Sequence, residues 1–349
     1  MRKGRYSIKQ IVGSVLFDLP HFILSTLSNS KYSWIVVRNR NEKLIASPSG
    51  LGVQCNWQWT SDLLVAKVFL WTGRLLMQRS LACYPVVLGE THEPISSNPE
   101  VTFIIGHRGM ARLPNLLLTL SSIAGQKGTG IECIVVEQSV TPESKDHLPA
   151  WVRYIHTPVS DAAVAYNRSW AFNVGVRQAR GRVLVLHDND MLVPAAYAAE
   201  ILARVKDGYE VVNLKRLIFY LPKIYTKKIF STWTILGDVT PETVVQNLEA
   251  GGSIATTKDA YFAIGGFDES FAGWGGEDNE FWERAKTRNV WPYGYLPIIH
   301  LWHAPQIEKL KNGESRQYGL FWDLSRIPVN ERIEKLTSLS FGTIDGPQT

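Results

Sequence analysis

Residues 183–186 have the sequence VLVL, and residues 187–190 have the sequence HDND. Four consecutive aliphatic residues, two of them β-branched, predict a short strand that is buried on both faces, as strands of a parallel sheet are. Two carboxylates at the end of such a strand are costly unless a cation or hydrogen bonds compensate their charge. This stretch therefore predicts an α/β sheet with a polar site at one edge.

Segments of the same kinds alternate on both sides of this stretch. Apolar runs that predict strands lie at 101–105, 131–136 and 210–214, and segments that predict helices lie at 113–123, 167–179 and 194–205. Alternating strands and helices are typical of a mostly parallel sheet flanked by helices. In such sheets, ligands bind at the carboxyl ends of the strands, where the loops gather.

The composition excludes several classes of protein. The chain has 349 residues, of which 45% are hydrophobic and 20% charged, so it is neither disordered nor fibrous. A net charge of +5 is too small to indicate nucleic-acid binding, and no nucleic-acid partner is expected. Three cysteines without metal-ligand spacing favour a reducing compartment, so a cytoplasmic location is expected.

The length corresponds to roughly two domains at about 150 residues each. The polar, proline-containing segment 89–99 predicts a boundary. We therefore expect an N-terminal accessory region at 1–95, a main domain at 100–310 and a C-terminal extension at 311–349.

The N-terminal 27 residues are apolar with a basic start. Asp18 and Pro20 interrupt the apolar run, so a transmembrane helix is not expected. The preferred interpretation is an amphipathic helix that packs on the protein's own core. Peripheral contact with the inner face of a membrane is the alternative, because basic residues are interleaved with large apolar ones.

Asp188 and Asp190 form a D-x-D pair. Their oxygen atoms at a strand end suit Mg²⁺ or Mn²⁺, and such an ion can hold a diphosphate. The alternative is a polar turn, in which Asp and Asn are favoured for their turn geometry. The pattern is short, and only its position after a buried strand makes the metal site as good an interpretation as the turn.

The segment FAGWGGEDNE at 271–280 joins glycines, a tryptophan and carboxylates. The glycines around Trp274 predict a mobile loop that brings the indole against a substrate. Glu277 and Asp278 begin a predicted helix, where carboxylates are also common as capping groups. The glycines favour the functional interpretation, in which one carboxylate is a general base that takes a proton from an attacking hydroxyl.

His300 and His303 follow an apolar run at a spacing of three residues. They are candidate metal ligands, and the D-x-D carboxylates are candidates to complete the site. Arg108, after the first predicted strand, and Arg168 are candidates to bind a phosphate or carboxylate by a fork contact. For each arginine taken singly, a solvated side chain is the more frequent outcome.

The order of these motifs resembles that of the inverting GT-A glycosyltransferases, in particular the β-1,4-galactosyltransferase group and its bacterial relatives. The similarity covers about residues 100–305, and its most specific parts are FAGWGGEDNEF at 271–281 and N-R-x-x-x-x-N-V-G at 167–175. The resemblance implies a GT-A fold and a metal-dependent hexosyltransferase of polysaccharide biosynthesis. Such an enzyme transfers a sugar, galactose or an N-acetylhexosamine, from a UDP-sugar to a hydroxyl of a glycan or lipid-linked glycan.

The resemblance also implies individual roles. Asp188, Asp190, His300 and His303 are implied to hold Mn²⁺ or Mg²⁺, with His300 in the place of a methionine. The residues implied to contact substrate are Trp274, Gly275, Gly276, Arg108, Glu137, Gln138, Arg168, Asp188 and Gly252. Asp278 is implied to be the catalytic base, with Glu277 as the neighbouring carboxylate that binds the acceptor.

The sequence departs from the family pattern at Gly106, where the family has a proline, and residues 1–95 lie outside the match. Two other functions stay open. One is a metal-dependent phosphoesterase or nucleotidyltransferase built on the same D-x-D pair. The other is a carbohydrate-binding or scaffold protein of the same fold without activity. The sequence does not specify the oligomeric state.

Overall fold

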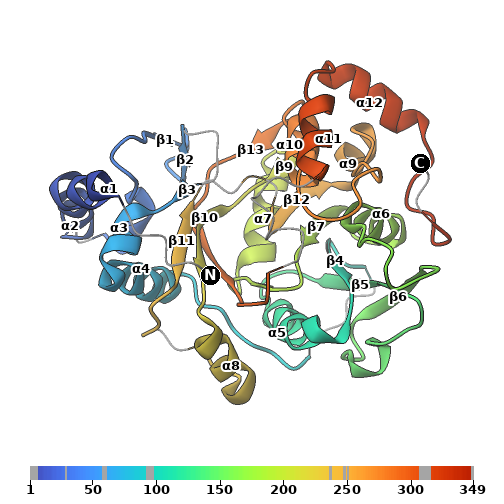
Figure 1. Ribbon diagram of the computed structural model, residues 1–349, viewed down its shortest axis with the longest axis horizontal. Coiled ribbons are helices and arrows are strands. Elements are labelled where there is room, and N and C mark those ends of the chain that lie inside the picture. The colour runs from blue at the N-terminus through green and yellow to red at the C-terminus, as the bar shows by residue number, and fades with distance from the viewer. Residues whose placement is uncertain are drawn as a thin grey trace.

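The protein is described by a computed structural model for residues 7–27, 30–56, 61–91, 98–235, 238–246, 249, 251–305 and 316–346. Two β-sheets and a two-stranded hairpin are covered by helices (Figure 1). Most of the predicted boundary segment, residues 92–97, lies outside the described residues.

The central sheet contains seven strands, which are β4 (Val101–His107), β5 (Ile131–Ser139), β6 (Arg153–Pro158), β7 (Val183–His187), β9 (Val211–Val212), β12 (Ser253–Thr257) and β13 (Val290–Trp291). Their order is β13-β9-β12-β7-β4-β5-β6. Only β12 is antiparallel to its neighbours. The predicted mostly parallel sheet is therefore confirmed.

Helices cover both faces of this sheet, because neighbouring side chains along each strand point to opposite faces. Phe103 packs in one hydrophobic cluster with residues of α5 (Leu113–Ala124) and α7 (Tyr197–Lys206). Ile104 packs in a second cluster with residues of α6 (Arg168–Gln178), α9 (Lys258–Ala263) and α10 (Glu277–Ala285). Both faces of the sheet are buried. This explains why polar and apolar residues do not alternate in VLVL and its neighbouring strands.

A second sheet lies beside the first and was not predicted from the sequence. Its strands are β3 (Ser61–Asp62), β8 (Met191–Leu192), β10 (Lys215–Tyr220), β11 (Thr243–Gln246) and β14 (Leu296–His300), in the order β3-β11-β10-β14-β8. Only β10 and β14 are parallel. Two of the strands have two residues each, too few for a period of two to be recognised in the sequence.

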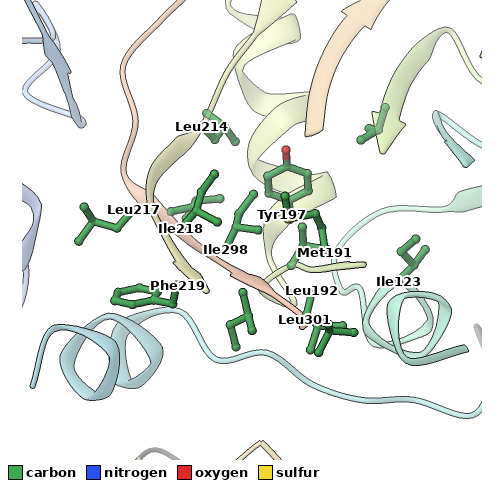
Figure 2. Close-up of a cluster of buried hydrophobic side chains, with 14 of the residues drawn as sticks. Ile123, Met191, Leu192, Tyr197, Leu214, Leu217, Ile218, Phe219, Ile298 and Leu301 are labelled. Atoms are coloured by element: carbon green, nitrogen blue, oxygen red, sulfur yellow. The ribbon is translucent and has the colours of Figure 1, made fainter. Parts of the chain in front are cut away.

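The core under the second sheet fixes the backbone next to the predicted metal residues (Figure 2). Met191 and Leu192 follow Asp190 directly, and Leu301 follows His300. Their side chains are buried together with residues of β10. Burying a side chain of this size contributes about 1.5–3 kcal/mol, so these segments are strongly anchored.

The N-terminal region is built from a helix and shorter elements. The helix Ile8–Leu27 is continuous through α1 (Ile8–Gly13), the π-helical η1 (Ser14–Asp18) and α2 (Leu19–Leu27). It is the one element of the described chain that is long and apolar enough, by length and composition, to cross a membrane. The other elements are η2 (Ser33–Val36), β1 (Leu44–Ala46), β2 (Val53–Cys55), α3 (Leu64–Val68) and α4 (Leu70–Cys83).

This region shares its core with the main domain. Trp34 and Leu76 belong to the same hydrophobic cluster as β10 and β14. The buried guanidinium of Arg216, on β10, donates hydrogen bonds of 2.5 Å to the carbonyl oxygens of Ile35 and Val37. The predicted division near residue 95 therefore does not separate two cores.

The remaining helices are η3 (Met110–Arg112), η4 (Lys145–His147), α8 (Lys223–Thr232), α11 (Arg316–Leu324) and α12 (Val329–Ser338). In the predicted C-terminal extension, α11 and α12 pack against α10. Arg332 of α12 forms ion pairs with Glu280 at 3.2 Å and with Glu283 at 2.6 Å. These ion pairs attach α12 to α10, the helix that begins with Glu277.

Candidate active site

A cavity of about 740 Å³ lies at the carboxyl ends of β4 and β7. Its wall includes Arg108, Arg168, Asp188, Asp190, Gly252, Trp274, Gly275, Gly276, Glu277, Asp278, His300 and His303. The structure thus brings twelve of the fourteen residues named from the sequence to one cavity. Glu137 and Gln138 are not among its lining residues.

Strand pairing explains how Asp190 meets two histidines that are more than a hundred residues away in the sequence. Antiparallel pairing of β8 with β14 sets Met191 opposite His300. The Leu301 amide donates a 2.8 Å hydrogen bond to the Asp190 carbonyl oxygen. Potential ligand atoms of Asp190, His300 and His303 all lie within 4.8 Å of one another.

The donor set of this group suits a divalent transition metal. Nε2 of His303 lies 3.3 Å from Oδ2 of Asp190, and Nε2 of His300 lies 3.8 Å from Oδ1. Nδ1 of His303 lies 2.8 Å from the Ala304 carbonyl oxygen, which makes Nδ1 the hydrogen-bond donor and leaves Nε2 as the ring nitrogen that faces Asp190. The His300 ring is stacked on Tyr220 with centroids 4.1 Å apart. One carboxylate and two imidazoles leave coordination positions for other ligands.

Asp188 is placed differently from its sequence prediction as a metal ligand. It is not part of the Asp190 group, and its Oδ1 forms a 2.7 Å ion pair with Arg168. Burial raises the pKa of Asp188 to about 6, against the opposing effect of Arg168. Burial alone would also raise the pKa of Asp190, but His300, His303 and Arg112 hold that pKa below its ordinary value. The two carboxylates of the D-x-D pair therefore have different partners.

Arg168 joins Asp188 to the carboxylates of α10. Its Nη1 lies 2.5 Å from Asp278 and 3.4 Å from Glu277. Asn167 caps the N-terminus of α6 by accepting from the Trp170 amide, and the guanidinium lies over the Phe172 ring at 4.6 Å. A solvated arginine is therefore the wrong interpretation here, because this side chain is only 13% exposed.

The two carboxylates at the start of α10 differ in their surroundings. The Glu277 side chain is 10% exposed, and its Oε2 accepts a 3.1 Å hydrogen bond from the Gly275 amide. Burial, and then the negative charge of Asp278, raise the pKa of Glu277 to about 7. The Asp278 side chain is 28% exposed and is the more accessible of the two from the cavity.

The glycines of this loop are required by its backbone and its packing. Gly276 has a φ of +88°, and a β-carbon there would lie 2.7 Å from the Gln317 carbonyl oxygen. The Trp274 ring meets Tyr318 of α11 edge to face, with centroids 5.6 Å apart. Trp274 thus lines the cavity beside α11, and the mobility of its loop and its contact with a substrate stay predictions.

Gly106, the departure from the family's proline, also has a steric reason. A β-carbon at Gly106 would lie 2.2 Å from the hydroxyl oxygen of Tyr166. Tyr166 lines the cavity, and its carbonyl oxygen accepts a 2.8 Å hydrogen bond from the Gly273 amide. The tyrosine therefore occupies the space that a larger residue at position 106 would take.

Glu137 and Gln138 have hydrogen-bond partners within the protein. The carboxylate of Glu137 accepts hydrogen bonds from the amides of Glu143 and Ser144, and Gln138 exchanges two hydrogen bonds with the backbone of Asn167. The predicted substrate contacts of these two side chains stay a prediction. The resemblance placed them at a strand end near the site, but the direction of each side chain depends on loop contacts that the sequence does not show.

We predict that Glu137→Gln destabilises the fold at neutral pH. Hydrogen bonds from Ser144 and Ser139 outweigh burial and lower the pKa of Glu137 from 4.5 to about 2. A carboxylate with a lowered pKa in the folded state stabilises the fold above its unfolded pKa, and this effect is lost as the pH falls through the folded pKa. The effect on the free energy of unfolding at pH 7 is about 3 kcal/mol.

Urea unfolding of the wild type and the variant at a series of pH values measures this difference. It is expected to shrink between pH 4.5 and pH 2. Glu143→Gln, an exposed glutamate in the same loop, is the matched control and should leave stability unchanged. A Glu137→Gln difference that does not depend on pH would contradict the assignment.

Arg112 is a site residue that the sequence analysis missed. It lies in η3, one short turn after Arg108, and its Nη1 is 2.7 Å from Oδ2 of Asp190. Arg108 itself points elsewhere, with hydrogen bonds to the carbonyl oxygens of Ala162 and Val164. The spacing in HRGMAR was the available signal, because a single 3₁₀ turn at a strand end can bring its last side chain back to the site.

We predict that Arg112→Met raises the affinity for Mn²⁺ in the absence of donor. The guanidinium places a positive charge on the same carboxylate that belongs to the metal group, so its removal relieves a competition. The expected increase is roughly tenfold, measured by titration calorimetry with Mn²⁺ alone. Arg108→Met is the matched control in the same cavity, and equal Mn²⁺ affinity in both variants and the wild type would refute the competition.

Two protein-family models match parts of this chain. Residues 110–239 match the model of glycosyl transferase family 2, and residues 246–295 match the model of the N-terminal domain of galactosyltransferase. A search of curated proteins gave no match. Similar solved structures include the catalytic domain of Drosophila β1,4-galactosyltransferase 7 in complex with xylobiose, with 15% identity and a TM-score of 0.33. The match covers 56% of this chain and 64% of the Drosophila chain.

Two further solved structures have similarly low scores. Glucosyl-3-phosphoglycerate synthase from Mycobacterium tuberculosis, in complex with Mn²⁺, UDP and glucosyl-3-phosphoglycerate, has 12% identity and a TM-score of 0.43, covering 68% of this chain and 83% of that one. A mannosyltransferase from Pyrobaculum calidifontis, in complex with GDP-Man and Mn²⁺, has 13% identity and a TM-score of 0.40, covering 77% and 82%. The two family models match adjacent segments that share one central sheet and one cavity, and the chain therefore carries a glycosyltransferase domain of the GT-A fold.

Proposed function

We propose that this protein transfers a hexose from a UDP-sugar to a hydroxyl of a glycan acceptor, with inversion at the anomeric carbon. The hexose is galactose or an N-acetylhexosamine. The observation that carries the proposal is the meeting, in one cavity, of a potential metal group (Asp190, His300 and His303) with a carboxylate pair (Glu277 and Asp278). Glycosyl transfer by single displacement needs this combination of a leaving-group site and a base.

The residues fit a divalent cation, Mn²⁺ or Mg²⁺. When bound by Asp190, His300 and His303, the cation supplies positive charge to the diphosphate that leaves. Among the cavity's own side chains, Arg112 adds a fixed positive charge beside this group, through its ion pair with Asp190. The flat faces of Trp274 and Tyr318 provide an apolar surface for a sugar ring.

Asp278 accepts the proton of the acceptor hydroxyl. The oxygen then forms a bond to the anomeric carbon while the bond from that carbon to the diphosphate breaks on the opposite face, so one step inverts the configuration. Asp278 is more suitable than Glu277 because its side chain is more accessible and Arg168 fixes its position at 2.5 Å. Glu277, whose pKa is about 7, is suited to hydrogen-bond an acceptor hydroxyl.

The acceptor class is part of the same proposal. We propose a glycan or lipid-linked glycan of polysaccharide biosynthesis, used on the cytoplasmic side of a membrane. The support is the volume of the cavity, about 740 Å³, which suits a donor and part of an acceptor bound side by side.

A panel of UDP-sugars and GDP-mannose, each with and without Mn²⁺, tests the proposal. A ligand that binds only the folded state raises the melting temperature, so a UDP-sugar is expected to do so in a Mn²⁺-dependent way and to release UDP when a glycan acceptor is added. Release of phosphate without sugar transfer would indicate a phosphoesterase. Glycan binding without UDP release would indicate an inactive carbohydrate-binding protein.

A further inference from the structure

The N-terminal helix Ile8–Leu27 is attached to the domain by one face. On this face, Asp18 is buried and forms a 2.6 Å ion pair with Arg40, and Ser14 donates a 3.0 Å hydrogen bond to the same carboxylate. Phe22 is fully buried, and its ring meets Trp71 of α4 edge to face at 5.5 Å. The helix therefore has a fixed orientation on the domain, and its outer face is defined.

The outer face is apolar and exposed. Ile8, Leu16, Leu24 and Leu27 are between 60% and 81% exposed, and Phe17 is 59% exposed. Residues 8, 12, 16 and 24 follow the four-residue spacing that puts side chains on one side of a helix. We call this surface, with the neighbouring exposed Leu70 and Trp71 of α4, the apolar N-terminal face.

The face lies at one edge of the molecule. In Figure 1, α1 and α2 lie at the left edge of the molecule, far from α11 and α12, and α3 and α4 lie between them and β11. Only 28% of the helix's most apolar window is buried inside the protein. An apolar surface of this extent is larger than the scattered exposed apolar residues that ordinary surfaces carry.

The segment of the sequence that contains this face is rich in basic residues. Residues 1–40 contain seven Lys and Arg and a single acidic residue, Asp18, which is already paired with Arg40. The other 309 residues contain 30 Lys and Arg against 31 Asp and Glu. The whole net positive charge of the chain is therefore carried by its first 40 residues, of which Lys9 stands exposed on the helix itself. A partner of this face must combine an apolar interior with negative surface charge.

We propose that the apolar N-terminal face docks in the plane of an anionic phospholipid bilayer. The apolar side chains enter the boundary between headgroups and acyl chains, Trp71 lies at the headgroup level, and the basic residues contact anionic headgroups. This inference does not depend on the sugar, the metal or the reaction.

In-plane docking agrees better with the structure than two other arrangements. A helix that crosses the bilayer would have to leave the domain, which breaks the Asp18–Arg40 ion pair and exposes Phe22. A symmetric dimer through this face would bring the basic segments of two copies together and leave their repulsion uncompensated. A bilayer has neither disadvantage.

Co-sedimentation of the full-length protein with lipid vesicles tests the inference. We expect binding to vesicles of phosphatidylcholine mixed with phosphatidylglycerol, weaker binding to phosphatidylcholine alone, and weaker binding at high salt. The double variant Leu16→Gln, Leu24→Gln should bind all vesicles at least roughly tenfold more weakly than the wild type. Lys9→Gln should bind about fivefold more weakly, and only to anionic vesicles.

The control variant is Ile224→Gln. Ile224 is 79% exposed on α8, outside the apolar N-terminal face, so its replacement should leave vesicle binding unchanged. Thermal unfolding checks that every variant folds, which is expected because the substituted side chains are exposed. UDP-sugar binding should be the same in all variants, so a failed vesicle experiment is distinguishable from a failed transferase assignment.

Three results would overturn the inference. The first is equal vesicle binding by the double variant and the wild type, or no binding by either. The second is a dimer in light scattering that the double variant abolishes, which would assign the face to a second copy of the chain. The third is retention in cell membranes after extraction at alkaline pH, which would show that the helix crosses the bilayer.

Discussion

Asp278→Asn is expected to remove nearly all sugar transfer while leaving UDP-sugar binding intact. Asparagine keeps the shape of the side chain and still accepts a hydrogen bond from Arg168, which lies 2.5 Å from the carboxylate. It does not accept the proton of the attacking hydroxyl. A positioned general base contributes roughly 10²–10⁴-fold, so kcat is expected to fall by that factor.

The comparison that isolates this effect uses two other variants. Asp259→Asn changes an exposed aspartate in the first turn of α9 and controls for loss of charge at a helix N-terminus. Glu277→Gln is expected to raise KM for the acceptor more than it lowers kcat. The dissociation constant for the donor, measured calorimetrically with Mn²⁺ present, should be nearly equal in the wild type and in Asp278→Asn. Transfer at the wild-type rate by Asp278→Asn would remove the base assignment.

Asp190→Asn is expected to have the second largest effect, through loss of metal binding. Asp190 is the only carboxylate in the described potential metal group, and it also balances Arg112. Its replacement leaves two imidazoles beside an arginine without a compensating negative charge. The affinity for Mn²⁺ should fall by at least about 100-fold, measured by electron paramagnetic resonance or calorimetry without donor.

Asp188→Asn is the matched variant, because it changes the other half of the D-x-D pair. Since Asp188 is paired with Arg168 and lies outside the potential metal group, its effect on Mn²⁺ affinity without donor should be much smaller. An equal loss in both variants would show that Asp188 is also a metal ligand. The thermal stability of both variants without metal separates this effect from unfolding.

Much of the central sheet could be predicted, because its strands are short continuous apolar runs. Residues 101–105, 131–136 and 183–186 all lie in strands of the central sheet. The predicted strand at 210–214 is reduced to Val211–Val212, and the predicted helix at 194–205 begins only at Tyr197, after the Pro194 turn. A local apolar pattern predicts that a strand or helix exists more reliably than it predicts the residues at which the element begins and ends.

Parts of the site could be predicted where the residue types within one short segment indicate a function, as for the aspartates, the histidines and the loop around Trp274. The second sheet was not, since it is formed by pairing between segments far apart in the chain. That pairing determines that Asp190, and not Asp188, faces the histidines. Similarly, the spacing in HRGMAR signals that either arginine can reach the site, and only the 3₁₀ turn seen in the structure shows that Arg112 is the one that contacts Asp190.

The hydrogen bonds from Arg216 to Ile35 and Val37 limit how this protein can be dissected. Truncation before residue 100 would strip a buried cation of two backbone acceptors and would also remove β3 from the edge of β11. The first hundred residues are therefore part of the folded domain, and we expect their deletion or replacement to destabilise it. The N-terminal elements are therefore joined by buried hydrogen bonds to β10, the strand whose Tyr220 lines the cavity.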